Sequence, residues 1–88
     1  MVTALIIVDP QNDFCEGGSL AVPNSNDIFG YINAFREKYD FDFVFITQDW
    51  HSQNHISFAK NHSLPSFSLK KINGKEEMLW PVHCVQNT

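Results

Sequence analysis

The chain has 88 residues, which is enough for one small domain or for part of a larger one. Hydrophobic residues make up 43% and charged residues 18%, so the chain is not wholly disordered, and a net charge of −4 with no basic patch argues against nucleic-acid binding. The longest apolar run, 4–8, is too short to cross a membrane, and two cysteines make no disulfide framework, so we expect a cytoplasmic protein.

The first half of the chain predicts a strand, a helix and a second strand. Residues 3–8 form an apolar run rich in β-branched side chains, as in a strand that is covered on both faces. A helix is expected to begin near residues 24–26, with one apolar stripe at positions 28, 29, 32, 35 and 39. A second apolar run follows at 41–46. This order predicts a βαβ unit with parallel strands, and therefore an α/β fold.

The second half of the chain has weaker patterns. Residues 52–68 are polar and aromatic without a clear period, as in a long functional loop. Asn73 and Gly74 predict the turn of a small hairpin. Because two parallel strands cannot cover their own faces and edges, we interpret residues 1–88 as the N-terminal part of a single domain.

Chemistry-bearing side chains follow both predicted strands. Asp9 follows the first strand, and Asp49 and His51 follow the second, so parallel strands would bring them to the sheet edge where α/β proteins bind ligands. Asp9 precedes a proline, and on local grounds we favour a turn whose carboxylate accepts bonds from nearby backbone N–H groups. The alternative is a general base, or a residue that orients one.

Asp49 and His51 have the spacing of metal ligands. In an extended segment they project to the same side and can share one divalent ion. A catalytic zinc site takes about three protein ligands, and His83 is the preferred third candidate. The other candidates are His55, His62 and Cys84. From spacing alone, a capped turn with a solvated histidine is the more frequent arrangement.

Five blocks of sequence stand out when they are taken together: 8–14 (VDPQNDF), 17–23 (GGSLAVP), 47–51 (TQDWH), 54–59 (NHISFA) and 79–86 (LWPVHCVQ). In this order they resemble the nicotinamidase family of the isochorismatase-like cysteine hydrolases. The resemblance implies a parallel-sheet α/β hydrolase fold, of which these residues supply the first βαβ unit and the loops of a metal site. It also implies hydrolysis of nicotinamide to nicotinate and ammonia, a step of NAD salvage, by an Asp, Lys and Cys triad.

The resemblance assigns a role to six residues of this chain. Asp9 matches the triad aspartate, which handles the proton of the nucleophile. Asp49, His51 and His83 match the metal ligands of the family. The metal is usually zinc, and the site holds the pyridine nitrogen of the substrate and waters. Phe14 and Trp80 resemble the aromatic walls around the substrate ring.

No residue of this chain matches the catalytic Lys or the nucleophilic Cys of the family, since Cys84 aligns with a cysteine of the metal-ligand block. We therefore expect the 88 residues alone not to hydrolyse nicotinamide at a useful rate. The alternatives are a related amidase of the same superfamily and a truncated, non-catalytic metal-binding fragment. The expected partner is a small-molecule substrate, with no nucleic acid and no membrane, and the sequence leaves the oligomeric state open.

Overall fold

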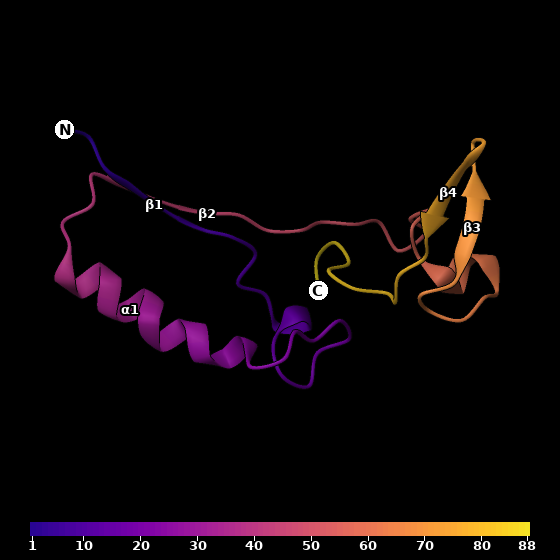
Figure 1. The fold of residues 1–88 in the computed structure, drawn as a ribbon, viewed down its shortest axis with the longest axis horizontal. Helices are drawn as coiled ribbons and strands as arrows, with labels where there is room; N and C mark the ends of the chain where they lie inside the picture. The colour runs from indigo at the N-terminus through magenta and orange to yellow at the C-terminus, as the bar shows by residue number, and fades with distance from the viewer. The chain divides into compact units, whose positions relative to one another are not determined.

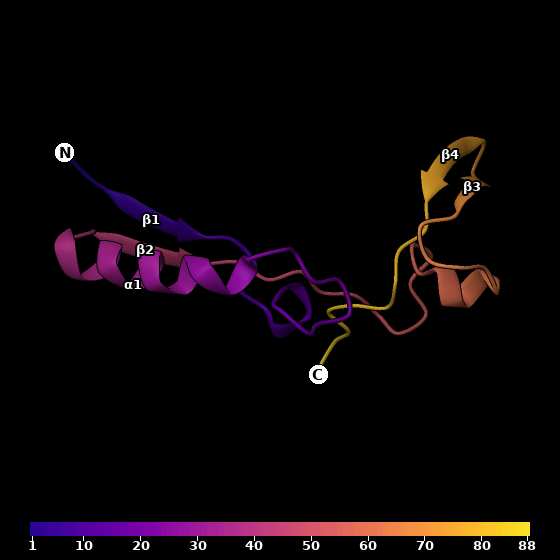
Figure 2. The same cartoon turned by 60° about the horizontal axis from the view of Figure 1, so that its bottom comes forward.

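The computed structural model describes all residues, Met1–Thr88, and the chain divides into two compact units, Met1–Asp49 and Trp50–Thr88. In the first unit, β1 (Ala4–Ile7) and β2 (Phe43–Ile46) pair in parallel. Between them lie two 3-10 turns, η1 (Asn12–Phe14) and η2 (Ser25–Asp27), and the helix α1 (Ile28–Lys38). Figures 1 and 2 show α1 running back alongside the two strands. The predicted βαβ unit and α/β fold are confirmed.

The helix begins and ends close to where its sequence pattern predicts. Asn24, in the left-handed conformation with φ of 60°, precedes η2, which leads directly into α1. The helix ends where the N–H of Tyr39 donates to the carbonyl of Phe35, and Arg36 and Lys38 in its last turn suit the helix dipole. With 11 residues α1 is the longest helix, and no helix has the length and hydropathy needed to cross a membrane.

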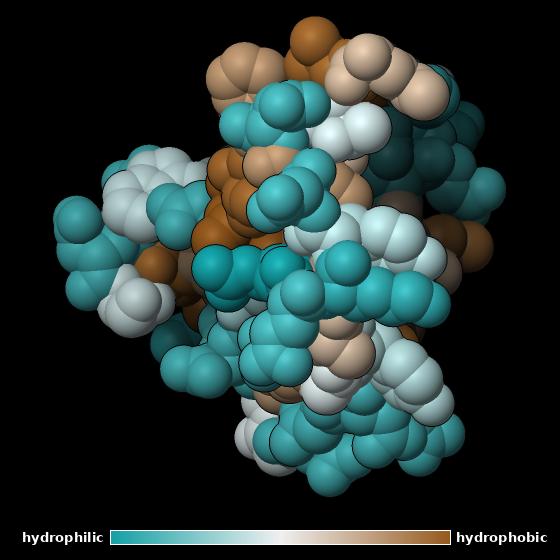
Figure 3. Space-filling model, turned by 90° about the vertical axis from the view of Figure 1, so that its left-hand side faces the viewer, coloured by the Kyte–Doolittle hydropathy of each residue, from teal (hydrophilic) through white to brown (hydrophobic).

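The first strand is not covered on both faces by residues 1–88, contrary to the expectation from its apolar run. Ile7 is the one buried residue of the β1–β2 pair, whereas Ile6 is 62% and Ile46 66% exposed. The helix offers little cover, because none of its own residues is buried. Apolar side chains therefore reach the surface among polar ones, as on the face that Figure 3 shows.

The second unit contains η3 (Ala59–His62) and an antiparallel hairpin of β3 (Leu69–Ile72) and β4 (Lys75–Met78). Asn73 and Gly74 connect the two strands with φ values of 52° and 78°. Two successive positive φ angles are typical of the two-residue turn that matches the twist of a hairpin, so the predicted turn is confirmed.

The core of the second unit is formed by residues from the segment 52–68, which has no clear periodicity, and by Leu79. Phe58 and Leu79 are fully buried, and Ala59 is 1% exposed. The backbone N–H of Leu79 donates to the carbonyl of Ser68 at 2.8 Å, and that of Trp80 donates to the carbonyl of Ser57 at 2.8 Å. Hydrogen bonds from the Leu79–Trp80 segment thus order the loop that precedes the hairpin.

Candidate metal centre

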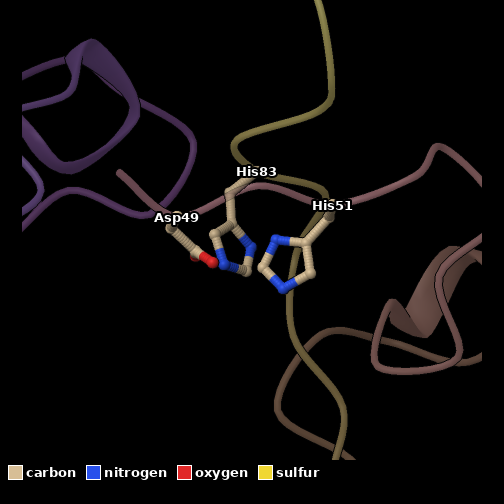
Figure 4. Close-up of side chains that lie close together, drawn as sticks. All are labelled: Asp49, His51 and His83. Atoms are coloured by element: carbon tan, nitrogen blue, oxygen red, sulfur yellow. The ribbon is translucent and has the colours of Figure 1, made fainter. Parts of the chain in front are cut away.

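Three of the metal-ligand candidates come together. One ligand atom each from Asp49, His51 and His83 lie within 4.8 Å of one another, and Figure 4 shows the carboxylate and the two imidazoles side by side. Asp49 and His51 are half-buried and His83 is buried. The other three candidates, His55, His62 and Cys84, are outside this cluster.

Backbone bonds explain why His51 meets His83, which is 32 residues further along the chain. The N–H of His51 donates to the carbonyl of Cys84 at 2.9 Å, and the carbonyl of His51 accepts from the N–H of Gln86 at 2.8 Å. His51 is therefore held like a strand residue against the segment that follows His83. The two ring centroids are 4.9 Å apart.

The orientation of His83 suits metal binding. Its Nδ1 lies 2.7 Å from the carbonyl oxygen of Pro81, which can only accept a hydrogen bond. Nδ1 therefore acts as the donor, and in the neutral ring this leaves the lone pair on Nε2, the atom that a metal would use. Metal-binding histidines are commonly fixed in this way, with the second ring nitrogen bonded to a carbonyl or carboxylate.

Phe58 forms the apolar support of the imidazoles, a role that the sequence analysis missed. Its ring is fully buried, with its centroid 5.2 Å from that of His51 and 5.5 Å from that of His83. A flat ring in contact with both imidazoles restricts their tilt. In the sequence, only its place in the block 54–59 distinguished Phe58 from the seven other phenylalanines.

The competing histidines have other contacts. The ring of His55 lies 4.6 Å from that of His51, but its Nδ1 lies 2.7 Å from the hydroxyl oxygen of Ser57. His62 places Nε2 at 2.7 Å from the carbonyl of Ile56 and Nδ1 at 3.0 Å from Nζ of Lys70. Both ring nitrogens of His62 are therefore engaged away from the cluster.

The donor set of the cluster fits a divalent metal ion. Two imidazoles and one carboxylate are the protein ligands of one kind of catalytic zinc site, which leaves further positions for water or substrate. The same donors also hold ferrous iron in other proteins, so they suit a divalent metal without selecting zinc.

Asp9 makes a different hydrogen bond from the one expected. Its Oδ1 accepts from the hydroxyl of Thr47 at 2.7 Å, and its own N–H donates to the same hydroxyl oxygen at 3.1 Å. The chain does turn here, with φ of 49° at Asp9 and a bond from the N–H of Gln11 to the carbonyl of Asp9. The Asp9 carboxylate is thus held by Thr47, the residue that follows β2, and not by backbone N–H groups of its own turn.

A cleft in the first unit contains Asp9 and Phe14. Its volume is about 330 Å³, which lies in the range of small-molecule sites. Its lining is mostly apolar and includes Val8, Pro10, Val22 and Ile28. Trp80 belongs to the second unit, where it is 37% exposed and its ring lies 6.0 Å from that of Phe67.

Comparison with known proteins identifies relatives of one kind. No family model matches the chain. A nicotinamidase of Acinetobacter baylyi is 48% identical over 86 residues, a match that covers 97% of this chain and 39% of that protein. Among solved structures, a nicotinamidase/pyrazinamidase of Acinetobacter baumannii superposes with a TM-score of 0.83 at 43% identity, covering 97% of this chain and 41% of that one.

A third relative was solved with a metal. The pyrazinamidase of Pyrococcus horikoshii in complex with zinc superposes with a TM-score of 0.63 at 42% identity, covering 97% of this chain and 40% of that one. The chain thus spans about two fifths of the length of these proteins. Over that part the chain is similar in sequence to nicotinamidases, and it shares their isochorismatase-like α/β fold.

Proposed function

We propose that this chain forms part of an amide hydrolase that converts nicotinamide to nicotinate and ammonia in NAD salvage. The observation that carries the proposal is the cluster of Asp49, His51 and His83 in a chain that matches nicotinamidases over 97% of its length. Residues 1–88 would be the N-terminal part of one hydrolase domain. The exposed apolar strands β1 and β2 support this view, because parallel strands are ordinarily covered on both faces.

The residues of the cluster would hold a divalent metal, most simply zinc. A bound metal would supply a positive centre that orients a ring nitrogen and water. Pro81 keeps the lone pair of His83 on Nε2, and Phe58 excludes water from behind the imidazoles. The name of the zinc-bound relative supports the assignment.

Asp9 would receive the proton of a cysteine nucleophile. We expect this cysteine and the catalytic lysine to lie outside residues 1–88. Thr47 holds the Asp9 carboxylate at one oxygen, so its direction is set before substrate enters. Phe14 lines the same cleft, and an apolar wall suits a neutral aromatic amide. Trp80 would supply a second aromatic wall.

The test is ammonia release by the intact protein with zinc, using nicotinamide, pyrazinamide and an aliphatic amide as substrates. We expect Asp9→Asn to lower kcat by about 10³-fold or more, in line with loss of a triad member. We expect His83→Ala to abolish zinc binding and turnover together. His62→Ala is the matched control, because His62 is outside the cluster. Turnover that survives Asp9→Asn would contradict the proposal.

A metal-binding chain without catalysis is the second candidate. It is favoured by one observation, that all three ligands of the cluster lie within residues 1–88. Zinc bound at one equivalent by the 88 residues, with no ammonia released, would be its result. A single amide other than nicotinamide as the preferred substrate of the intact protein would point instead to a related amidase.

A further inference from the structure

We propose that Gln11 is a positioning residue for the metal centre, because its side-chain amide holds the backbone of Asp49 and so sets the direction of the Asp49 carboxylate. The inference rests on the proposed metal-binding role of Asp49. It concerns a residue outside the ligand cluster, and Gln11 acts only through the residue that it holds.

Two hydrogen bonds join Gln11 to Asp49. Nε2 of Gln11 donates to the carbonyl oxygen of Asp49 at 3.0 Å, and the N–H of Asp49 donates to Oε1 of Gln11 at 2.8 Å. Both bonds are partly buried and connect residues 38 positions apart. Gln11 is itself fixed, since its N–H donates to the carbonyl of Asp9 at 2.8 Å.

The place of these bonds in the fold indicates what they do. The backbone ladder of β1 and β2 extends to the bond between the N–H of Thr47 and the carbonyl of Ile7, at 2.9 Å. Beyond it the first strand turns away, because Asp9 is left-handed and residue 10 is a proline without an N–H. The amide of Gln11 then pairs with both polar backbone groups of Asp49, and so replaces the backbone groups of a neighbouring strand.

The shape of an amide side chain suits this pair of bonds. It offers a donor and an acceptor in one plane, whereas a carboxylate offers acceptors alone and a lysine donors alone. Of the amides, glutamine carries one more methylene than asparagine. The N–H and the carbonyl of Asp49 belong to the two peptide groups on either side of its Cα, so holding both restricts φ and ψ of Asp49 and fixes the direction of its Cα–Cβ bond.

That direction is important because metal coordination tolerates little displacement. Carboxylate oxygens lie about 2.0–2.2 Å from zinc, and distances in genuine sites vary by about 0.2 Å. A peptide free to rotate would move the carboxylate by more than that. Outer residues that orient ligands change metal affinity by about 10–100-fold when they are replaced, and we expect Gln11 to fall in this range.

The experiment measures zinc affinity of the intact protein by competition with a chromophoric chelator, and the absorption spectrum of the cobalt-substituted protein. Gln11→Met keeps the length of the side chain and removes both bonds. The matched control is Asn26→Leu, which removes a bond from the N–H of Glu16 to Oδ1 of Asn26 at 3.1 Å in the same unit. Gln11→Asn, with the amide one methylene shorter, serves if Gln11→Met does not fold.

We expect Gln11→Met and Gln11→Asn to weaken zinc binding by about 10–100-fold and to change the cobalt spectrum. Asn26→Leu should leave both the zinc affinity and the cobalt spectrum unchanged. Wild-type zinc affinity and an unaltered spectrum in a folded Gln11 variant would overturn the inference while the metal centre stands. Failure of the wild-type protein itself to bind zinc would overturn both proposals, so the two failures are distinguished by which protein shows them.

Discussion

Replacing Phe58 tests whether the metal centre depends on its apolar support. The Phe58 ring is fully buried and contacts His51 and His83. Phe to Ala changes in protein cores cost about 3–5 kcal/mol. For a chain of this size each kcal/mol lowers Tm by about 4–8 °C, so Phe58→Ala should lower it by at least about 12 °C. That loss is a large share of the 5–15 kcal/mol that stabilises a typical domain.

A second variant separates support of the imidazoles from general stability. Phe58→Leu keeps most of the apolar volume and removes the flat ring, whose contacts with other rings contribute about 0.5–1.5 kcal/mol beyond area. Zinc at 100 times its Kd should raise the stability of the wild-type protein by about 2.7 kcal/mol. In Phe58→Leu we expect a folded protein in which the same zinc concentration raises Tm by clearly less.

The assay is thermal unfolding with and without zinc, followed by circular dichroism. Phe67→Ala is the control, because Phe67 lies in the same unit but is 55% exposed, so its loss should cost only about 1–2 kcal/mol. Equal Tm losses for Phe58→Ala and Phe67→Ala would refute the core role. An undiminished zinc response in Phe58→Leu would refute the support of the imidazoles.

Two further predictions concern the loops around the strand ends. Thr47→Val removes the hydroxyl that donates to the Asp9 carboxylate, and we expect kcat for nicotinamide in the intact protein to fall about tenfold, which is about 1.4 kcal/mol in activation free energy. Thr47→Ser keeps the hydroxyl and should retain the rate. Equal rates for both variants would exclude a role for the hydroxyl. A Cβ at Gly18 would lie 2.4 Å from backbone oxygens, so Gly18→Ala should lower Tm. Gly30→Ala in α1 meets open space and should stabilise the protein by about 0.5–1 kcal/mol. The same unfolding measurement checks both variants, and a Tm of Gly18→Ala at or above the wild-type value would contradict the clash.

The secondary structure of the first unit could be predicted because its signals are local. A β-branched run, a helical stripe and a second apolar run each need only a few neighbouring residues. Their burial could not be predicted in the same way, since it depends on what covers them. Phe35 and Tyr39 belong to the predicted stripe and are 51% and 47% exposed, and Ile46 is 66% exposed although its run is wholly apolar.

The metal cluster was predictable in part, for a reason that its geometry explains. Asp49 and His51 are close in the chain, so their spacing alone suggests a shared ion. The bonds of His51 to Cys84 and Gln86, which bring in His83, pair segments more than 30 residues apart. No local pattern records such a pairing, so the residues alone left His83 as the preferred one of four candidates, and the resemblance to nicotinamidases then favoured it as well.

The backbone leaves regular structure at two residues in or beside the proposed site. Asp9 and Cys84 both have φ near 50°, a left-handed conformation that costs most residues about 1–2 kcal/mol and that glycine, asparagine and aspartate adopt more readily. Each lies at or beside a residue of the proposed site, and each turns the chain out of an extended path. The turn at Asp9 could be predicted from the proline that follows it. The bonds by which Gln11 takes over the hydrogen bonding of the strand could not, because they join residues 38 positions apart. Local rules are therefore least informative at the site itself, as expected where the requirements of function conflict with those of regular structure.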